Sequence, residues 1–544
     1  MKSDSQKNET NWQSFSRNFQ YYSSVGVGLD YSRAKLPNNF LDRYKKSAED
    51  MFFEMAELER GKVANPDEGR MVGHYWLRTS ELAPNAAIAL EIDLQQKAVR
   101  EFSASVLGGI QQTPEGEEFS HAVLLGIGGS ALGPQLLIDA LAPMSGGLQM
   151  SFCDNTDPDG IARILSNLGD NLRTTLFIVA SKSGGTIETR NALLEVASWC
   201  QARAIEFAPR AVAITCFGSK LDSQSKGEGW LKQFYIWDWV GGRTSIFSAV
   251  GLLPAELAGI DTASLLKGAS RMDELTRVAD LEKNPAAILA IAWHWLGNGR
   301  GAKDMVLLPY KDRLILFSRY LQQLVMESLG KEKNRQGKVV EQGLSVFGNK
   351  GSTDQHAYVQ QLRDGIDNFF VTFIRVLSDY TGDACNETPC EVEPNVFSGD
   401  YLNGFLLGTR QALSAKGRSS LTISLDTLSP LSLGAMIAMY ERTVGFYASL
   451  VDINAYDQPG VEAGKKAASE VIDIHRKLVA LLSEQSPGAL AINAQDAALS
   501  IGAPEDAETV FHILSYLAAN EYRGIVQEGE THPDKARFRR ALNV

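Results

Sequence analysis

The sequence lacks the features that mark several large protein classes. It has five cysteines and no Cys-x-x-Cys pair, which indicates neither a zinc ribbon nor a dithiol redox site. Its longest nearly apolar run, residues 286–296, is too short to cross a bilayer. The first fifteen residues lack the apolar segment of a secretory signal. We therefore expect a cytoplasmic protein with no membrane partner.

The sequence also has fewer positively than negatively charged residues. The chain has 53 Lys and Arg against 65 Asp and Glu, a net charge of −12. Because an acidic chain repels polyphosphate, we expect no nucleic-acid partner, and any phosphate must be bound by a local cluster. No Gly-Lys-Ser/Thr, His-Glu-x-x-His or Cys/His cluster occurs, so we expect neither a metal nor another cofactor.

Short apolar runs that alternate with helix-like stretches predict a parallel, doubly wound α/β architecture. The runs lie at residues 122–125, 176–180 and 212–216, and a second series lies at 305–308, 369–376 and 421–425. In the second series, residues 314–329 are the clearest helix. We predict a helical N-terminal segment packing on the larger domain (1–100), a first α/β domain (101–260), a second (261–450) and a helical C-terminal segment (451–544).

The first chemistry-bearing segment is VLLGIGGSALG, residues 123–133. A predicted strand runs into Gly126, Gly128, Gly129 and Ser130, and a helix follows. Exposed N–H groups at a helix N-terminus bind anions, and glycines let the backbone approach closely. The same letters fit a dinucleotide fingerprint, with Asp154 as the later acid. This segment alone leaves a dinucleotide, another phosphate and a tight turn without chemistry all open.

The second segment is FIVASKSGGTIET, residues 177–189. It places Ser181, Lys182, Ser183 and Thr186 around two glycines at a predicted helix N-terminus. Hydroxyls and one ammonium suit a phosphate monoester, whereas a capping box would explain neither the lysine nor the glycines. Together the two segments favour a sugar-phosphate site.

Four further positions carry candidate chemistry, each with an ordinary structural alternative. Arg243 follows two glycines and can project from a tight turn. Gln323 and Glu327, four apart, border an apolar helix face that can partly desolvate a carboxylate and make it a base. His356 lies among Gly, Ser and Asp, and Lys465 in a first helical turn. By residue type alone, a solvated glutamate and a solvated lysine are the more usual interpretations, and a loop histidine is as usual as a catalytic one.

Six segments now resemble a known family. LLGIGGSALGP, ASKSGGTIET, GGRTSIFSAVG, QQLVMESLGK, GNKGSTDQHAY and YDQPGVEAGK lie between residues 124 and 465 in the order and spacing of the glucose-6-phosphate isomerase family. The resemblance removes the dinucleotide alternative. It implies two αβα sandwich domains of the sugar-isomerase type with parallel-rich sheets, and metal-independent isomerisation of glucose 6-phosphate and fructose 6-phosphate through a cis-enediol in glycolysis and gluconeogenesis.

The resemblance also implies residue roles and a homodimer. Glu327 would be the base, Arg243 would stabilise the enediolate, and His356, contributed in trans by the partner subunit, and Lys465 would open the sugar ring. The remaining substrate contacts implied are Gly129, Ser130, Ser181, Lys182, Ser183 and Thr186 for the phosphate, and Glu188, Gln323 and Gln458 for orientation.

Two alternatives and two gaps remain at this stage. A close alternative enzyme also accepts mannose 6-phosphate, and a sugar-phosphate-binding regulator would keep the phosphate loops without catalysis. Glu327, His356 and Lys465 together argue against the regulator, since binding alone does not need them. The sequence assigns no role to the tail beyond Lys465, nor does it decide whether Cys385 and Cys390 form a regulatory disulfide.

Overall fold

The computed structural model describes residues 11–381, 389–486 and 489–541, without the side chains of residues 461–463 and 465. These residues form two compact units, one ending at Asp457 and the other starting at Gln458. Cys385 lies outside the described residues, and Cys390 is an exposed free thiol. The question whether these two cysteines form a disulfide, which the sequence left open, is therefore untested.

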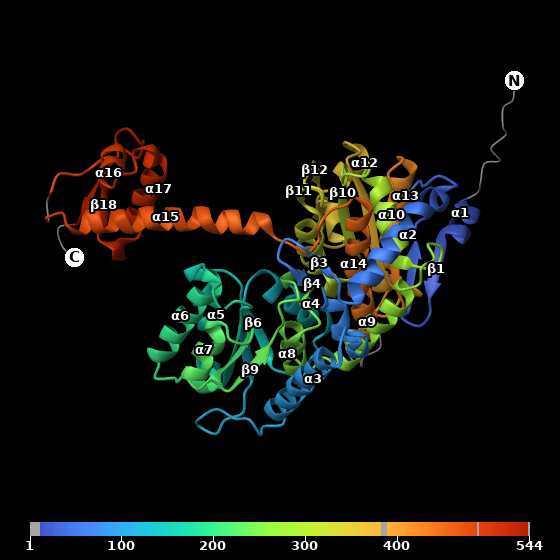
Figure 1. Ribbon diagram of the computed structural model, residues 1–544, viewed down its shortest axis with the longest axis horizontal. Helices are drawn as coiled ribbons and strands as arrows, with labels where there is room; N and C mark the ends of the chain where they lie inside the picture. Colours follow the sequence, from blue (N-terminus) through green and yellow to red (C-terminus); the bar gives the residue numbers. More distant parts are fainter. Residues whose placement is uncertain (1–10, 382–388, 487–488, 542–544) are drawn as a thin grey trace. The chain divides into compact units, whose positions relative to one another are not determined.

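The first sheet of the larger unit has five parallel strands. They are β5 (His121–Leu125), β6 (Gln149–Cys153), β7 (Thr175–Ala180), β8 (Ala211–Thr215) and β9 (Lys232–Tyr235), in the order β6-β5-β7-β8-β9. One face packs on α5 (Pro158–Leu168), α6 (Ile187–Gln201) and α7 (Lys220–Gly227). The other packs on α3 (Ala86–Leu107), α4 (Leu132–Leu141) and α8 (Ala249–Leu257). Helices thus cover both faces (Figure 1).

The second sheet of this unit repeats that topology. Its parallel strands β10 (Asp304–Pro309), β13 (Val346–Phe347), β14 (Phe369–Val376) and β17 (Ser420–Leu425) lie in the order β13-β10-β14-β17. In both sheets the second strand of the series lies on one side of the first, and the later strands extend on the other side. Such a reversal opens a crevice at the carboxyl ends of the two central strands, where α/β proteins bind ligands.

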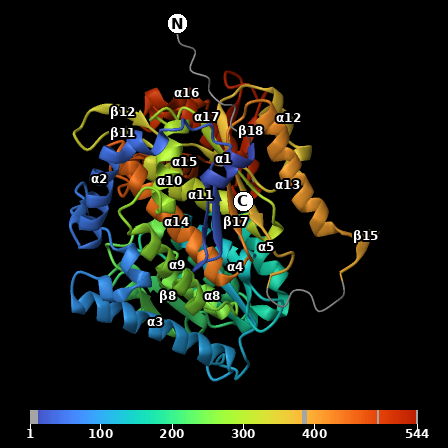
Figure 2. The same cartoon turned by 90° about the vertical axis from the view of Figure 1, so that its right-hand side faces the viewer.

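Helices cover the second sheet on both faces as well. α12 (Val359–Asp364) and α13 (Ser398–Ala415) pack on one face. The other face lies against a core that includes α2 (Phe40–Glu59), α9 (Thr262–Thr276), α10 (Pro285–Leu296) and α14 (Pro430–Leu450). Figure 2 shows α12 and α13 on the opposite side of this sheet from α2, α10 and α14.

The predicted strands agree closely with the structure. All six predicted runs form parallel strands, each within one residue of its predicted limits. The N-terminal segment, besides its helices α1 (Asn11–Asn18), α2 and α3, contributes a hairpin that the prediction did not include. Its strand β2 (Val27–Asp30) pairs antiparallel with β17, and β1 (Phe19–Tyr22) pairs antiparallel with β2 at the edge of the second sheet. The four predicted segments and the three boundaries between them remain predictions.

The predicted helix over residues 314–329 needs correction. It begins as a 3-10 turn, η7 (Asp312–Leu314), continues as α11 (Phe317–Leu321) and then becomes a π-helical stretch, η8 (Gln322–Glu327). The apolar face that suggested a regular helix is nevertheless buried, at Phe317, Leu321 and Leu324. π-Helical turns are rare and frequently lie at functional sites.

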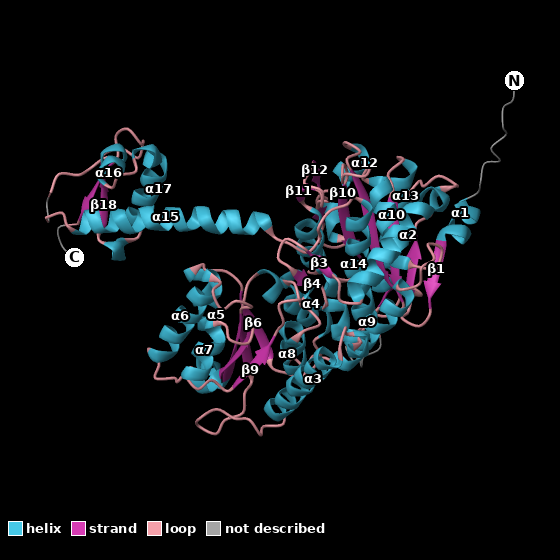
Figure 3. Ribbon diagram, viewed as in Figure 1, coloured by secondary structure: helices cyan, strands magenta, loops and turns pink. Residues whose placement is uncertain are grey.

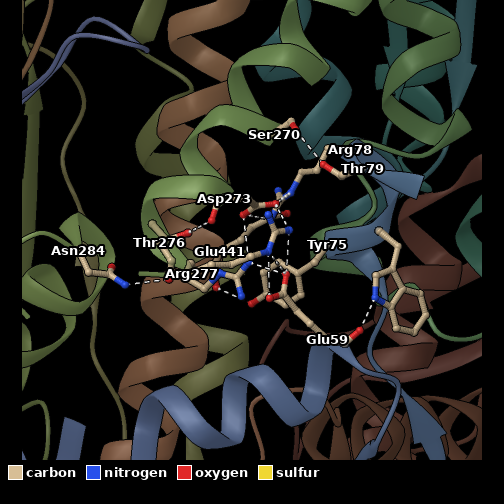
Figure 4. Close-up of polar contacts among 12 residues, drawn as sticks. Glu59, Tyr75, Arg78, Thr79, Ser270, Asp273, Thr276, Arg277, Asn284 and Glu441 are labelled. Atoms are coloured by element: carbon tan, nitrogen blue, oxygen red, sulfur yellow. Dashed lines mark hydrogen bonds and ion pairs between the residues drawn. The ribbon is translucent and has the colours of Figure 1, made fainter. Parts of the chain in front are cut away.

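A network of buried charges joins the helices behind the two sheets (Figure 4). Arg78, from the turn η1 (His74–Arg78), is fully buried and contacts Asp273 of α9 at 2.6 Å and Glu441 of α14 at 2.5 Å. Arg442 binds Glu59 of α2 at 2.8 Å and Asp273 at 3.2 Å. Burial raises the pKa of Glu59, but the guanidinium groups of Arg442 and Arg277 outweigh it and hold that pKa at about 2.

The smaller unit has its own core. It consists of α15 (Pro459–Ser483), α16 (Ala494–Ser500), α17 (Ala507–Ala519) and the antiparallel pair β18 (Ile525–Glu528) and β19 (Arg537–Arg540). Leu478, Leu482, Leu514 and Phe538 are fully buried within it. Figure 3 distinguishes its helices from its strand pair. Across the described helices of both units, none is long and apolar enough to cross a bilayer.

Three further short strand pairs complete the larger unit. β11 (Lys331–Lys333) pairs with β12 (Val339–Gln342), β3 (Val63–Asn65) with β4 (Arg70–Met71), and β15 (Glu391–Glu393) with β16 (Val396–Phe397). All three pairs are antiparallel. The first of them follows directly on the π-helical stretch and so bears on the site described below.

Candidate active site

The two predicted phosphate loops follow β5 and β7, the central strands of the first sheet. Because these strands are neighbours, their loops meet at one edge. The loop after β5 forms the turn η3 (Gly128–Ser130), in which Ser130 is partly exposed. A Cβ at Gly129 would lie 2.0 Å from the carbonyl oxygen of Gly242. Glycine therefore permits close contact with the segment that carries Arg243.

The loop after β7 ends at the N-terminus of α6 with several open donors. Ser181 Oγ donates to Thr186 Oγ1 at 3.1 Å, and Ser183 Oγ accepts from the N–H of Gly185 at 3.1 Å. In the described part of the chain, the N–H groups of Lys182, Ser183 and Thr186 donate no hydrogen bond, and Thr186 does not cap α6 through its side chain. Hydroxyls and open N–H groups at a helix N-terminus can bind a phosphate.

The side chain of Lys182 has a different environment from the one that the sequence suggested. Its Nζ donates to the carbonyl oxygens of Asp238 and Val240, each at 2.8 Å. Burial lowers the pKa of Lys182. The ammonium therefore fixes the phosphate loop to the segment that precedes Gly241. That it also contacts phosphate remains a prediction.

Arg243 and Glu327 form a buried pair beside these loops. Arg243 lies in the turn η6 (Gly242–Thr244), and its Nη1 is 3.4 Å from Glu327 Oε2. Both of these atoms are buried, and neither has a hydrogen-bond partner among the described residues. Burial lowers the pKa of Arg243, which the Glu327 carboxylate opposes. Two opposite charges with unmade hydrogen bonds thus face each other.

The other donors of Arg243 are fixed. Its Nε donates to Ser328 Oγ at 2.7 Å, and its Nη2 donates to the carbonyl oxygens of Ala455 at 2.5 Å and Asp457 at 3.0 Å. A guanidinium has five N–H groups. Three are used in these contacts, so the two on Nη1, next to Glu327, are the ones left over.

The π-helical stretch η8 places Gln323 and Glu327 toward this region. A Cβ on Gly128 would lie 3.2 Å from Gln323 Nε2, so the amide lies over the first phosphate loop. Gln323 thereby approaches the phosphate loop, while Glu327 approaches Arg243. The structure brings together Gly129, Ser130, Arg243, Gln323 and Glu327.

The remaining predicted residues are divided between the two units. His356 ends the turn η9 (Thr353–His356) and is exposed, with no hydrogen bond or ion pair to the predicted site residues in the described ranges. Glu188 is partly exposed in the first turn of α6. Gln458 caps α15 in the smaller unit, and Lys465 lies on α15 with its side chain outside the described part.

Three residues at this site were not predicted from the sequence. Ser328 and Asp457 bind Arg243, and Lys331 binds both Asp457 and the carbonyl oxygen of Glu327. Lys331 stands four residues after Glu327, a spacing usually found in exposed helical ion pairs. Asp457 is 126 residues further along the chain. No local pattern identifies such a contact.

Comparison with known proteins gives one consistent result. A profile of the phosphoglucose isomerase family matches residues 30–395 and 409–486. Glucose-6-phosphate isomerase of Geotalea daltonii is 52% identical over 525 residues, 96% of this chain and 98% of that protein. The enzyme of the same name from Synechococcus elongatus is 54% identical over 521 residues, 96% and 97% of the two chains. A crystal structure of a glucose-6-phosphate isomerase from Chlamydia trachomatis superposes with a TM-score of 0.76 at 27% identity, covering 85% of this chain and 91% of that one.

Proposed function

This chain belongs to the phosphoglucose isomerase family, and on that premise we propose how its residues catalyse the reversible isomerisation of glucose 6-phosphate to fructose 6-phosphate. The reaction moves one proton from C2 of the open-chain aldose to C1. The carbonyl group shifts from C1 to C2 because the C2 hydroxyl loses its proton and the C1 oxygen gains one, with no net oxidation.

Glu327 is the base in this proposal. Its carboxylate removes the proton from C2, and the electron pair of the C–H bond forms the C1=C2 bond of a cis-enediolate. The same carboxyl group returns the proton to C1, because a 1,2-shift needs only one base that reaches both carbons. The supporting observation is the pair of unpartnered buried atoms, Glu327 Oε2 and Arg243 Nη1, 3.4 Å apart.

Arg243 stabilises the negative charge that forms on the substrate oxygen. Its other N–H groups are fixed by Ser328, Ala455 and Asp457, so Nη1 is held without reorganisation. Fixed donors of this kind contribute roughly 3–4 kcal/mol to the stability of an oxyanion transition state.

The 6-phosphate binds at the N-terminus of α6 in this proposal. Its oxygens accept from the hydroxyls of Ser130, Ser181, Ser183 and Thr186 and from open N–H groups of the loop, including that of Lys182. The close packing of Gly129 holds the other phosphate loop, which follows β5, against the segment that carries Arg243. Gln323 and Glu188 orient the sugar.

Ring opening and subunit assembly rest on the family resemblance. We propose a homodimer in which the partner's His356 completes the site, with Lys465 and Gln458 acting on the ring oxygen and on substrate orientation. His356 is exposed and contacts none of the predicted site residues whose side chains the structure describes, which supports a role in trans. A cytoplasmic location is part of the same proposal.

The test is a coupled assay on purified, EDTA-treated protein. Fructose 6-phosphate is supplied, and glucose 6-phosphate is detected through an added dehydrogenase. Glu327→Gln should lower kcat by about 10²–10⁴-fold, the usual contribution of a general base, while fructose 6-phosphate still binds. Glu332→Gln, a change of an exposed carboxylate five residues on, is the matched control and should behave as wild type.

The outcomes separate the alternatives. Undiminished turnover in Glu327→Gln would exclude Glu327 as the base. Binding of sugar phosphate by a wild-type protein that shows no turnover would instead favour a regulator. Turnover of mannose 6-phosphate in the same assay format would identify the broader enzyme.

A further inference from the structure

Lys331 is a buried lysine beside the site. The proposed mechanism gives this lysine no role. It begins β11 directly after Gly330 and is 7% exposed. Its Nζ contacts the carbonyl oxygen of Glu327 at 2.9 Å, the carbonyl oxygen of Asp457 at 3.2 Å and Asp457 Oδ1 at 3.1 Å. The two carbonyl contacts are hydrogen bonds, whereas the carboxylate contact is an ion pair, and Asp457 Oδ1 has no hydrogen-bond partner among the described residues.

The contact with Glu327 satisfies a group that a helix end leaves open. The last carbonyls of a helix have no partner within it, and a cation near them is stabilising. The ammonium of Lys331 binds the peptide oxygen of the proposed base itself. The position of the Glu327 backbone therefore depends on where this ammonium is held.

Asp457 holds the ammonium and also holds Arg243. Its carbonyl oxygen accepts from Arg243 Nη2 at 3.0 Å as well as from Lys331. Arg243 in turn binds Ser328, the residue after Glu327. Lys331 thus connects Glu327 to Asp457, and Arg243 connects Ser328 to Asp457. Together these contacts form a closed ring that includes both Glu327 and Arg243.

Charge makes this ring specific for an ammonium. Burial lowers the pKa of Lys331, the nearby Arg243 guanidinium lowers it further, and the Asp457 carboxylate opposes both effects. The side chains of Lys331 and Asp457 are 5% and 16% exposed. Removing the ammonium would leave the Asp457 carboxylate without its cation and the Glu327 carbonyl without its donor.

From these contacts we propose that Lys331 is a positioning residue, which sets the geometry between Glu327 and Arg243 for proton transfer. This inference rests on the proposed roles of those two residues. Lys331 does not touch the phosphate loops in any described contact, so it acts on the chemical step and not on phosphate binding.

The first test is the variant Lys331→Met in the isomerase assay. A misplacement of about 1 Å at a reacting group costs roughly 10²-fold in rate, so kcat should fall by about that factor. The KM for fructose 6-phosphate should change by less than about threefold, because uniform substrate binding is kept. Lys333→Met alters an exposed lysine on the same strand and should leave both constants unchanged.

A second pair of variants separates positioning from stability. Lys331→Met leaves the Asp457 carboxylate buried and unpaired, which destabilises the fold. The double variant Lys331→Met/Asp457→Asn removes that charge, so its melting temperature should recover toward that of wild type. Its kcat should stay low, because the carbonyl of Glu327 still lacks its donor. Recovery of kcat together with stability would show that Lys331 has only a structural role and would overturn the proposal.

Each remaining outcome is decisive. Wild-type kcat in folded Lys331→Met overturns the proposal. If Lys331→Met does not fold, the double variant decides in its place, with a low kcat supporting the proposal and a wild-type kcat overturning it. Glu327→Gln is measured in parallel: if it is inactive while Lys331→Met is fully active, only the positioning inference fails. If Glu327→Gln is active, the proposed base fails instead.

Discussion

Gly129→Ala is the smallest change that tests how the site is assembled. Gly129 packs against the backbone of Gly242, the residue before Arg243. The added Cβ would lie 2.0 Å from the Gly242 oxygen, and such contacts essentially never fall below 3.0 Å. One of the two segments must therefore move by about 1 Å. Either the phosphate loop or the arginine loses its position.

The expected size follows from that displacement. A misplacement of about 1 Å lowers kcat/KM by roughly 10²-fold, or about 2.7 kcal/mol of transition-state stabilisation. The coupled isomerase assay measures it, with circular dichroism to establish that the variant is folded. Gly227→Ala is the control, since a Cβ there meets nothing within 4 Å. A folded Gly129→Ala with wild-type kcat/KM would refute the close contact as a determinant of the site.

Two predictions concern the buried charge network. The folded protein holds the pKa of Glu59 at about 2, against 4.5 for an unperturbed glutamate. The stability that ionised Glu59 contributes to the fold is therefore complete above about pH 4.5 and is lost as the pH falls toward 2. Urea titrations over this pH range should show that the unfolding free energy of the wild-type protein falls by about 3 kcal/mol more than that of Glu59→Gln. If the unfolding free energies of the two proteins depend equally on pH, the lowered pKa of Glu59 is contradicted. Arg78→Leu leaves Glu441 buried without its guanidinium, while Asp273 keeps Arg442. The variant should cost about 3–5 kcal/mol of unfolding free energy, whereas a cost below about 1 kcal/mol would show that the network tolerates the loss of Arg78.

Six of the nine parallel strands that the structure describes were predicted from the sequence, because their signal is local, whereas β6, β9 and β13 were not. A buried parallel strand is a short, largely apolar run, and three of the six runs end directly before a glycine or polar residue, at Gly126, Ser181 and Asp426. The phosphate loops were predictable for the same reason, since strand, glycines and hydroxyls follow one another directly. The hairpin of β1 and β2 was not, because its place at the edge of the second sheet depends on pairing with β17, some 390 residues away.

The geometry around Glu327 could not be predicted from periodicity. An apolar face at Phe317, Leu321 and Leu324 fits a regular helix, and no residue in the stretch signals a π-helical turn. The contact of Lys331 with Asp457 depends on two segments that only the tertiary fold brings together. The family resemblance thus named Glu327 and Arg243 as candidates for the base and its partner, whereas their mutual orientation depends on residues that are distant in sequence.

The two sheets of the larger unit share one topology but differ in the residues at the carboxyl ends of their central strands. In both sheets of the larger unit the strand order places a crevice at the carboxyl ends of the central strands, and open donors have been described above at the one beside β5 and β7. At β10 and β14, a cavity of about 780 Å³ is lined, among the described residues, by three basic side chains and three acidic ones: Lys311, Arg313 and Arg375, and Asp312, Asp379 and Asp400. The carboxylate of Asp379 lies against Gly399 in the first turn of α13, where a Cβ would be 2.2 Å from its Oδ1, and Asp400 accepts from the N–H of Phe397. The chain's own carboxylates therefore occupy the helix N-terminus of the second crevice, while serines, threonine and glycines leave that of α6 available to a phosphate.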